Sequence, residues 1–246
     1  MQHATLDLGD GRRIAYHRSE GRAPGIVFLG GFRSDMTGTK AQYLEGWARA
    51  RGQAFLRFDY GGHGVSSGDF LDCDVGTWAR DAEEAVGRLT AGPQLLVGSS
   101  MGGWLALILA RRMPQRIAGL VGIAAAPDFT EDAMWARFDE GQRAEIAAGR
   151  PVMLPSEYGD DPYPITRRLI EEGRRHLVLR DRLALPFPVR LLQGTADRDV
   201  DAGVALRLLA HAEGPDIRLT LVKGADHRFS RPENLELLAR TIAELL

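Results

Sequence analysis

The sequence of 246 residues contains a single cysteine, Cys73, which excludes an internal disulfide and a cluster of cysteine metal ligands. Lysine is also scarce, since Lys40 and Lys223 are the only two among 31 lysines and arginines. Neither sign of charge dominates, because 33 acidic residues bring the formal net charge to −2. A nucleic-acid-binding protein is expected to show a basic excess or a basic stripe. We therefore expect no nucleic-acid partner.

Long hydrophobic runs are missing as well. The longest apolar stretches, such as residues 117–126, are well short of the roughly 20 residues that a membrane-spanning helix needs, so we expect no stable membrane insertion. Residues 1–13 have neither an apolar core nor a positively charged leader. Signal and transit peptides depend on such features, so we expect neither of them and a cytoplasmic location.

Two further features favour ordinary structural explanations. The arginines are scattered among acidic residues, which is typical of solvated surfaces rather than of an anion-binding face. Cys73 lies between Asp72 and Asp74, whose negative charges raise the pKa of a thiol and disfavour a catalytic cysteine. The nucleophile of any covalent chemistry is therefore expected elsewhere.

Short β-branched runs alternate with longer amphipathic stretches. The predicted strands are residues 26–30, 54–60, 94–98, 117–124, 189–194 and 217–223. The predicted helices are residues 40–51, 77–90, 101–112, 202–212 and 232–245. Residues 4–8 and 12–17 flank Gly9-Asp10-Gly11, which predicts a hairpin at one edge of the sheet. This alternation predicts an α/β fold with a mostly parallel, eight-stranded sheet covered by helices on both faces.

One region breaks the alternation. Residues 128–185 contain no convincing strand, two or three helical segments and several prolines. An unstructured loop of that size is uncommon in a compact domain, so we expect a helical cap over the carboxyl edge of the sheet, where such sheets bind ligands. The core then comprises residues 1–127 and 188–246, and the cap insertion comprises residues 128–187.

One motif carries a recognisable chemistry. A predicted strand runs into Gly98-Ser99-Ser100-Met101-Gly102, and a predicted helix follows at once. This G-x-S-x-G pattern is typical of a tight strand-to-helix turn that holds its central serine in strained backbone angles. The residues two before and two after that serine must lack side chains, because strand and helix pack closely there. Ser100 meets this condition and Ser99 does not, so Ser100 is the candidate nucleophile.

A serine nucleophile needs a base to take its proton and a carboxylate to orient that base. Enzymes with this turn place the partners in the order serine, acid, histidine. His227 follows a predicted strand on a loop and is the candidate base. The other histidines lie ahead of the sheet core, in the predicted cap, on a predicted helix or in a glycine-rich loop: His3 and His17, His176, His211, and His63.

Asp197 comes first after the strand that precedes it and is the candidate acid. Asp199 is its close rival and would instead cap the next helix. Ser100, Asp197 and His227 thus form the predicted catalytic triad. If they were unrelated loop residues, their positions at three strand ends would require three coincidences.

Acyl transfer also needs donors for the developing oxyanion. The backbone N–H of Met101, directly after the candidate nucleophile, is one candidate, and the N–H of Phe32, in the glycine-containing loop after an early strand, is the other. His63 lies between glycines with no other histidine or cysteine at ligand spacing, which favours a structural hydrogen-bonding role over a second base or a metal ligand. We expect neither a metal nor a cofactor.

Large apolar side chains in the predicted cap are open to two interpretations. They could line an acyl pocket or pack the cap against the sheet, and the sequence does not separate these: Met134, Trp135, Phe138, Met153, Tyr158 and Tyr163.

Several segments of the chain resemble the α/β-hydrolase superfamily, along nearly its whole length. They are PGIVFLGGFRSDMTGTKA, FLRFDYGGHGVSSG, VGSSMGGWLAL, VRLLQGTADRDV and GADHR, with LPSEYGDDPY in the cap. Within the superfamily they are similar to a narrower group of mitochondrial thioesterases that remove palmitoyl groups from proteins and cleave drug acyl-glucuronides. The resemblance implies an α/β-hydrolase fold with the catalytic roles on Ser100, Asp197 and His227. Gly30-Gly31 departs from the His-Gly of many relatives outside the group, which leaves the backbone donor intact.

We therefore expect a serine esterase or thioesterase that acts through an acyl-enzyme. Its substrate would be an acyl ester or thioester, on a small molecule or on an acylated protein. The alternatives are a carboxylesterase or acyl-glucuronide esterase, a carbon–carbon bond hydrolase and, more remotely, a non-catalytic ligand-binding receptor. The sequence leaves the acyl chain length and the oligomeric state open.

Overall fold

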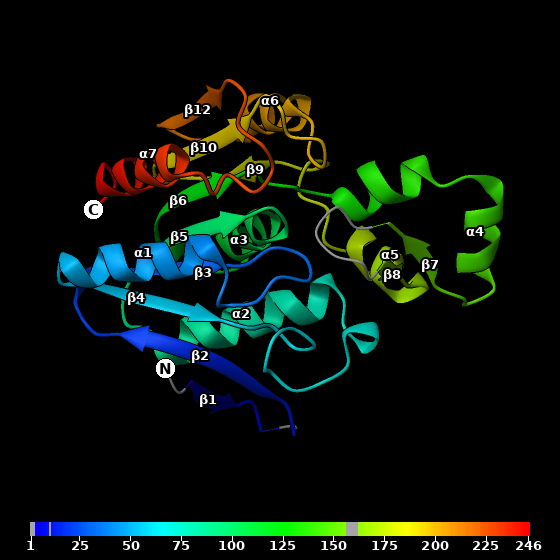
Figure 1. The fold of residues 1–246 in the computed structure, drawn as a ribbon, viewed down its shortest axis with the longest axis horizontal. Coiled ribbons are helices and arrows are strands. Elements are labelled where there is room, and N and C mark those ends of the chain that lie inside the picture. Colours follow the sequence, from blue (N-terminus) through cyan, green and yellow to red (C-terminus); the bar gives the residue numbers. More distant parts are fainter. Residues whose placement is uncertain (1–2, 10, 156–161) are drawn as a thin grey trace.

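The computed structural model describes residues 3–9, 11–155 and 162–246. Eight strands form one sheet in the order β1-β2-β4-β3-β5-β6-β10-β12 (Figure 1). Their bounds are β1 Ala4–Asp7, β2 Arg13–Ser19, β3 Arg22–Leu29, β4 Gln53–Phe58, β5 Gln94–Ser99, β6 Ile117–Ile123, β10 Val189–Gly194 and β12 Ile217–Val222. β2 pairs antiparallel with both β1 and β4, and the strands from β4 to β12 pair in parallel. The predicted sheet with its antiparallel edge is confirmed.

Helices cover both faces of this sheet (Figure 1). They are α1 Thr39–Ala50, α2 Val75–Leu89, α3 Met101–Arg112, α6 Ala202–His211 and α7 Pro232–Ala243, with short 3-10 turns at Phe70–Asp72 and Pro114–Arg116. Successive side chains of a strand point to opposite faces, so Ile26 and Phe28 of β3 join the core under α1 and α7. Val27 and Leu29 join the larger core under α2 and α3. The central strands β5 and β6 are mostly apolar and buried along nearly their whole length, because both faces of the sheet are covered there.

The chain between β6 and β10 leaves the sheet and lies at the end toward which the parallel strands point (Figure 1). Its elements are the π-helical turn Thr130–Trp135, α4 Glu140–Ala147, β7 Val152–Leu154, β8 Tyr163–Ile165, α5 Arg167–Arg174 and β9 Leu183–Ala184, the last paired with β11 Ala212–Glu213. Three helical segments agree with the prediction.

The prediction of a segment without strands is wrong, because β7 and β8 pair as an antiparallel hairpin with Met153 opposite Pro164. Strands of three residues are too short to show an alternating pattern, and proline normally indicates a break in a strand. A two-stranded ribbon tolerates proline because both of its strands are edges.

Both ends of this segment are tied to each other and to the core. The carboxylate of Asp128, fully buried where the chain leaves the sheet, accepts the N–H groups of Val178 and Leu179 at 2.8 and 3.0 Å. Near the same return path, the indole of Trp104 on α3 donates to the carbonyl of His176 at 3.1 Å. These bonds fix where the segment lies over the carboxyl end of the sheet.

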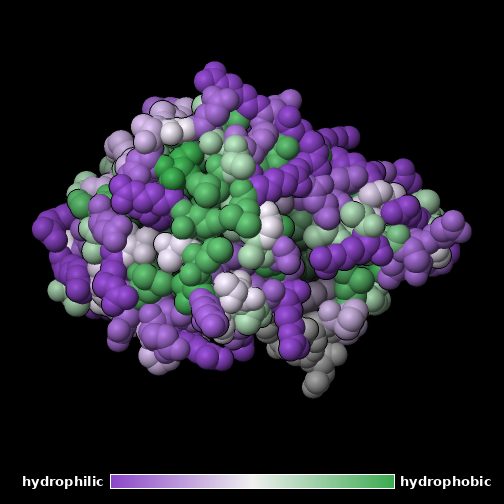
Figure 2. All heavy atoms as spheres, turned by 90° about the horizontal axis from the view of Figure 1, so that it is seen from above, coloured by the Kyte–Doolittle hydropathy of each residue, from purple (hydrophilic) through white to green (hydrophobic). Residues whose placement is uncertain are grey.

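The face seen from above is mostly polar around its margin, with apolar side chains gathered in the middle (Figure 2). Two large apolar side chains near the β12 edge of the sheet are exposed. Leu206 of α6 is 50% exposed, and Leu221 of the edge strand β12 is 46% exposed. Over the described ranges of the chain, no helix combines the length and apolar character needed to cross a membrane.

Candidate active site

Ser100 lies in the turn between β5 and α3 with φ of +55° and ψ of −118°. This left-handed φ is rare for a residue with a side chain and is the strained conformation that the motif predicts. A Cβ on Gly98 would lie 2.4 Å from the carbonyl oxygen of Gly102, and a Cβ on Gly102 would lie 2.0 Å from that of Leu29. The close approach of strand and helix therefore requires both glycines.

Gly102→Ala is expected to destabilise the fold by about 3 kcal/mol, because the new methyl group meets backbone rather than a movable side chain. The free energy of unfolding in denaturant measures this effect. Gly46→Ala is the matched control, since Gly46 is exposed on α1 and a methyl group added there would meet nothing within 4 Å. That variant should gain about 0.5–1 kcal/mol. Equal unfolding free energies for the two variants would contradict the packing argument.

The structure brings the three predicted triad side chains together. His227 Nε2 lies 3.1 Å from Ser100 Oγ, and His227 Nδ1 lies 2.9 Å from Asp197 Oδ2. Ser100 follows β5, Asp197 follows β10 and His227 follows β12, all at the carboxyl end of the parallel strands. Residues separated by up to 127 positions thus form one hydrogen-bonded line at the edge where such sheets bind ligands.

Asp197 is held by more than the imidazole. Its Oδ2 also accepts from Gln193 Nε2 at 2.9 Å, while its Oδ1 accepts the N–H groups of Asp199 and Val200 at 3.0 and 2.9 Å. Burial by itself would raise the pKa of Asp197, but the bonds and charge from His227, Val200 and Gln193 outweigh it and lower that pKa. The carboxylate therefore stays ionised and fixed in orientation.

Asp199, the rival acid, lies beside Asp197 and donates its backbone N–H to this carboxylate. One atom each from Asp197, Asp199 and His227 lies within 4.8 Å of the others, the spacing of a metal-ligand group. Two of these atoms bond each other, and Nε2 of His227 faces Ser100. This geometry suits transfer of a proton from Ser100 to His227, with Asp197 orienting the imidazole, better than coordination of an ion.

The candidate oxyanion donors lie on two sides of the nucleophile. Met101 is the first residue of α3, and both Met101 and Phe32 line the cavity that contains Ser100. A Cβ on Gly31 would lie 3.5 Å from Ser100 Cβ, so the loop that carries Phe32 runs beside the serine. A backbone donor places no demand on its own side chain, yet the Phe32 side chain packs edge-on against four rings at 5.1–5.8 Å: Phe70, Trp78, Phe129 and Tyr163.

The cavity at Ser100 has a volume of about 770 Å³. Its apolar lining includes Phe32, Met101, Phe129, Met134, Phe138, Leu154 and Tyr163. Its basic lining is Arg33, Lys40, Arg137, Arg198 and Arg228, against the acidic Asp35 and Asp199. The cavity therefore combines apolar walls with an excess of positive charge.

The sequence left open whether six large cap side chains line the pocket or pack the cap against the sheet, and the structure shows some of each. Met134, Phe138 and Tyr163 line the cavity. Trp135 packs instead, with its ring 6.1 Å from Phe138 and under the guanidinium of Arg174. Met153 is 52% exposed. Tyr158, with most of the LPSEYGDDPY segment, lies outside the described residues.

Sequence reasoning missed several residues of the site. Phe129 lines the cavity at the start of the π-helical turn that follows β6, and the only signal for it in the sequence was its place in the segment after that strand. Lys40 also lines it, and its amine donates to the carbonyl of Arg228, next to His227. Burial, aided by the charge of Arg228, lowers the pKa of Lys40 to about 8. The only feature of the sequence that sets Lys40 apart is the scarcity of lysine, since the chain has just two.

His63 is buried and bonded on both ring nitrogens, as its structural interpretation predicts. Nδ1 lies 3.2 Å from the carbonyl oxygen of Gly61, and Nε2 accepts the N–H of Arg33 at 3.1 Å. Burial lowers the pKa of His63 to about 4, so the ring is neutral near pH 7. For Cys73, burial and then the charges of Asp81 and Asp74 raise the thiol pKa to about 11, consistent with an unreactive cysteine.

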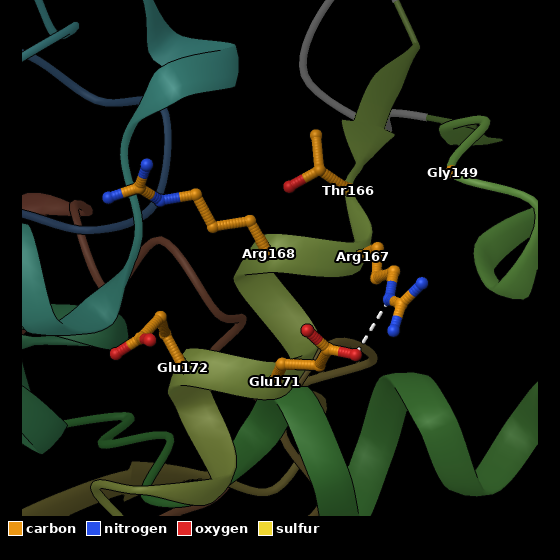
Figure 3. A pocket seen from close by; sticks show the side chains of 6 residues that line it. All are labelled: Gly149, Thr166, Arg167, Arg168, Glu171 and Glu172. Atoms are coloured by element: carbon orange, nitrogen blue, oxygen red, sulfur yellow. Dashed lines mark hydrogen bonds and ion pairs between the residues drawn. The ribbon is translucent and has the colours of Figure 1, made fainter.

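A second hollow lies on α5, away from this cavity (Figure 3). Its lining residues are Gly149, Thr166, Arg167, Arg168, Glu171 and Glu172, none of which lines the Ser100 cavity. Arg167 pairs with Glu171, and Arg168 reaches the buried carboxylate of Asp74 at 2.5 Å. These pairs stabilise α5 and join it to the N-terminus of α2, which gives the hollow a structural explanation.

Relatives are found for nearly the whole chain. A rat protein named "Palmitoyl-protein thioesterase ABHD10, mitochondrial" is 37% identical over 95% of this chain and 78% of its own length. The human protein of the same name is 33% identical over 98% and 79%. The solved structure of mouse alpha/beta hydrolase domain-containing protein 10 superposes with a TM-score of 0.92 at 34% identity, covering all of this chain and 98% of the other.

The prediction of a cytoplasmic location is contradicted by these relatives, which are named mitochondrial. The start of the chain was an unsound basis for that prediction. A targeting leader is cleaved from the mature protein, so the composition of a chain's first residues does not report its compartment.

The family comparison agrees with the fold and with these relatives. Residues 26–240 match the Alpha/beta hydrolase family, which spans the sheet from β3 to α7 and includes Ser100, Asp197 and His227. The rat and human relatives are named thioesterases. The chain therefore belongs to the Alpha/beta hydrolase family and is an ester or thioester hydrolase.

Proposed function

We propose that this chain is a serine acyl-thioesterase in which Ser100 is the nucleophile, His227 the general base and Asp197 the residue that orients the histidine. The observation that carries the proposal is the hydrogen-bonded line from Ser100 through His227 to Asp197, which opens into an apolar cavity. The names of the relatives favour a thioester over an oxygen ester.

The geometry supports a two-step reaction. His227 Nε2 takes the hydroxyl proton as Ser100 Oγ attacks the acyl carbonyl, and the carboxylate of Asp197 stabilises the imidazolium that forms. The N–H groups of Met101 and Phe32 hold the oxyanion. His227 then protonates the leaving thiolate, and a water activated by the same histidine releases the acid and restores Ser100.

In the same proposal, residues 128–187 form the cap that shapes the substrate pocket. Phe129, Met134 and Phe138 of this segment supply apolar walls that suit an acyl chain. A palmitoyl chain on a protein is the substrate named for the relatives, and we extend a long-chain preference to this chain. The acyl acceptor is then a protein or a small thiol.

The test is hydrolysis of acyl thioesters from acetyl to palmitoyl beside oxygen esters of the same acyl groups. We expect turnover to peak at a long chain and to favour the thioester at that length. Labelling of Ser100 by a fluorophosphonate identifies the nucleophile independently. Absence of turnover on both series, or faster oxygen-ester cleavage at every chain length, would overturn the thioesterase proposal.

A second candidate is hydrolysis of esters with an anionic leaving group, such as acyl-glucuronides. The observation that favours it is the basic excess in the cavity lining, where Arg33, Lys40, Arg137, Arg198 and Arg228 face two acidic residues. Comparison of an acyl-glucuronide with the neutral methyl ester of the same acid tests it. Equal kcat/KM for the two at low and high salt would dismiss a role for these charges.

A further inference from the structure

The loop that carries the Phe32 N–H is a turn with an unusual third residue. The N–H of Ser34 donates to the carbonyl of Gly31 at 3.1 Å and closes a four-residue turn, and the Ser34 hydroxyl donates to the same carbonyl at 2.9 Å. Arg33, at the third position, has φ of +54°. A positive φ there is the mark of a type II turn and usually requires glycine. An arginine needs a compensating interaction to remain in that conformation.

His63 supplies that interaction. In a type II turn the central peptide, here between Phe32 and Arg33, is flipped relative to the more common type I turn, and the Arg33 N–H marks its orientation. That N–H donates to His63 Nε2 at 3.1 Å. Because Nε2 must accept, Nδ1 carries the ring proton and donates to the Gly61 carbonyl at 3.2 Å. The imidazole is thereby confined to one tautomer.

The same turn sets the direction of the Phe32 N–H. The C=O and N–H of a trans peptide point in opposite directions. Since Gly31 directs its C=O at Ser34, the N–H of Phe32 on the same peptide points away from Ser34. Gly31 also lies beside Ser100, where the oxyanion of an attacked carbonyl would form. Phe32 joins this peptide to the strained Phe32–Arg33 peptide, so a loop released from the Arg33 conformation would no longer hold the donor in a single direction.

We propose that His63 is a positioning residue for the oxyanion site: its Nε2 accepts the Arg33 N–H, holds the Gly31–Ser34 turn in its positive-φ form and so aims the Phe32 N–H at the oxyanion. The inference rests on the proposed serine mechanism. The His63 side chain is only 3% exposed, and its ring packs edge-on against Phe70 and Trp78 at 5.3 and 5.2 Å. This packing holds the imidazole in place. His63 touches no reacting atom in this scheme.

The test compares variants that keep or remove the acceptor. His63→Asn retains a group near Nδ1 but no acceptor for Arg33, and His63→Gln places an amide oxygen near the position of Nε2. Gln94→Met is the control, because it removes a 2.8 Å bond from a buried side chain to the Ala91 carbonyl at the amino end of β5, the opposite end of that strand from Ser100. Each variant is assayed for kcat, KM, thermal stability and the affinity of a trifluoromethyl ketone with the substrate's acyl chain.

The trifluoromethyl ketone reports on the oxyanion directly. Ser100 Oγ adds to its carbonyl carbon, the serine proton moves to His227, and the carbonyl oxygen becomes an anion. We expect His63→Asn to lower kcat about 10- to 100-fold with KM nearly unchanged, and to weaken the ketone by the same factor. His63→Gln should recover most of both losses. Gln94→Met should lose thermal stability while kcat stays within about threefold.

Two outcomes would overturn the inference. In one, His63→Asn leaves kcat and ketone affinity no lower than Gln94→Met does. In the other, ¹⁵N NMR of the wild-type His63 ring finds the proton on Nε2, a result that needs no folded variant. Failure of the proposed function looks different, since the wild type would then show neither turnover nor fluorophosphonate labelling of Ser100.

Discussion

Ser100→Ala should lower kcat about 10⁶-fold on the best thioester, because the three residues of a triad act as a unit and the remaining rate comes from binding and the oxyanion donors alone. The fold should persist, since alanine and serine carry a similar penalty at the φ of +55°. Thermal unfolding checks this point. Residual activity near a tenth of the wild-type rate would refute the assignment of the nucleophile.

Ser99→Ala is the matched comparison for this prediction. Ser99 is adjacent in sequence, but its neighbours two positions away carry side chains, and it is the last residue of β5 rather than the centre of the turn. Its loss should lower kcat by less than about tenfold. The contrast between the two serines separates loss of the nucleophile from general disturbance of the site.

Asp197→Asn is expected to lower kcat about 10⁴-fold while leaving the protein folded. The N–H groups of Asp199 and Val200 both donate to Oδ1, so the amide oxygen of an asparagine must take that position. The NH₂ group then faces His227 Nδ1 and donates to it. This bond places the imidazole proton on Nε2, where it blocks acceptance of the Ser100 proton.

Asp199→Asn decides between the two candidate acids. The bond that orients His227 runs from Nδ1 to Asp197, and the backbone N–H of Asp199, which supports Asp197, survives the substitution. Activity should stay within about threefold of the wild type. If Asp199→Asn and Asp197→Asn exchanged these outcomes, the orientation of His227 would have to be assigned to Asp199.

The elements that position the site follow closely from the sequence. α3 and β10 have the predicted bounds, residues 101–112 and 189–194, because each is a strong local pattern next to glycine or a charged turn. β3 begins earlier than predicted, at Arg22 instead of residue 26. Pro24 interrupts its apolar run, and the pairing with β4 shifts register between Arg22 and Ile26, so the early part has no clear pattern.

The sequence predicts the segment between β6 and β10 less well than it predicts the core. Its position and helices were predictable from the break in strand–helix alternation, but the β7–β8 hairpin was not, because three-residue strands carry almost no periodic signal. Which of its aromatic side chains line the cavity was equally undecided. Trp135 and Phe138 are close in sequence and their rings contact each other, yet only Phe138 lines the Ser100 cavity, while Trp135 packs under the guanidinium of Arg174.

The sequence by itself determined the class of fold, the strained serine turn and the order of Ser100, Asp197 and His227 at strand ends, because these depend on local periodicity and on small residues at fixed spacing. Only the tertiary structure decided that His63 supports the turn of Arg33, 30 residues away, and that Phe32 sits among four aromatic rings. Such contacts join segments that are distant in the chain. Their geometry depends on how the whole sheet and its helices pack, which no local pattern encodes.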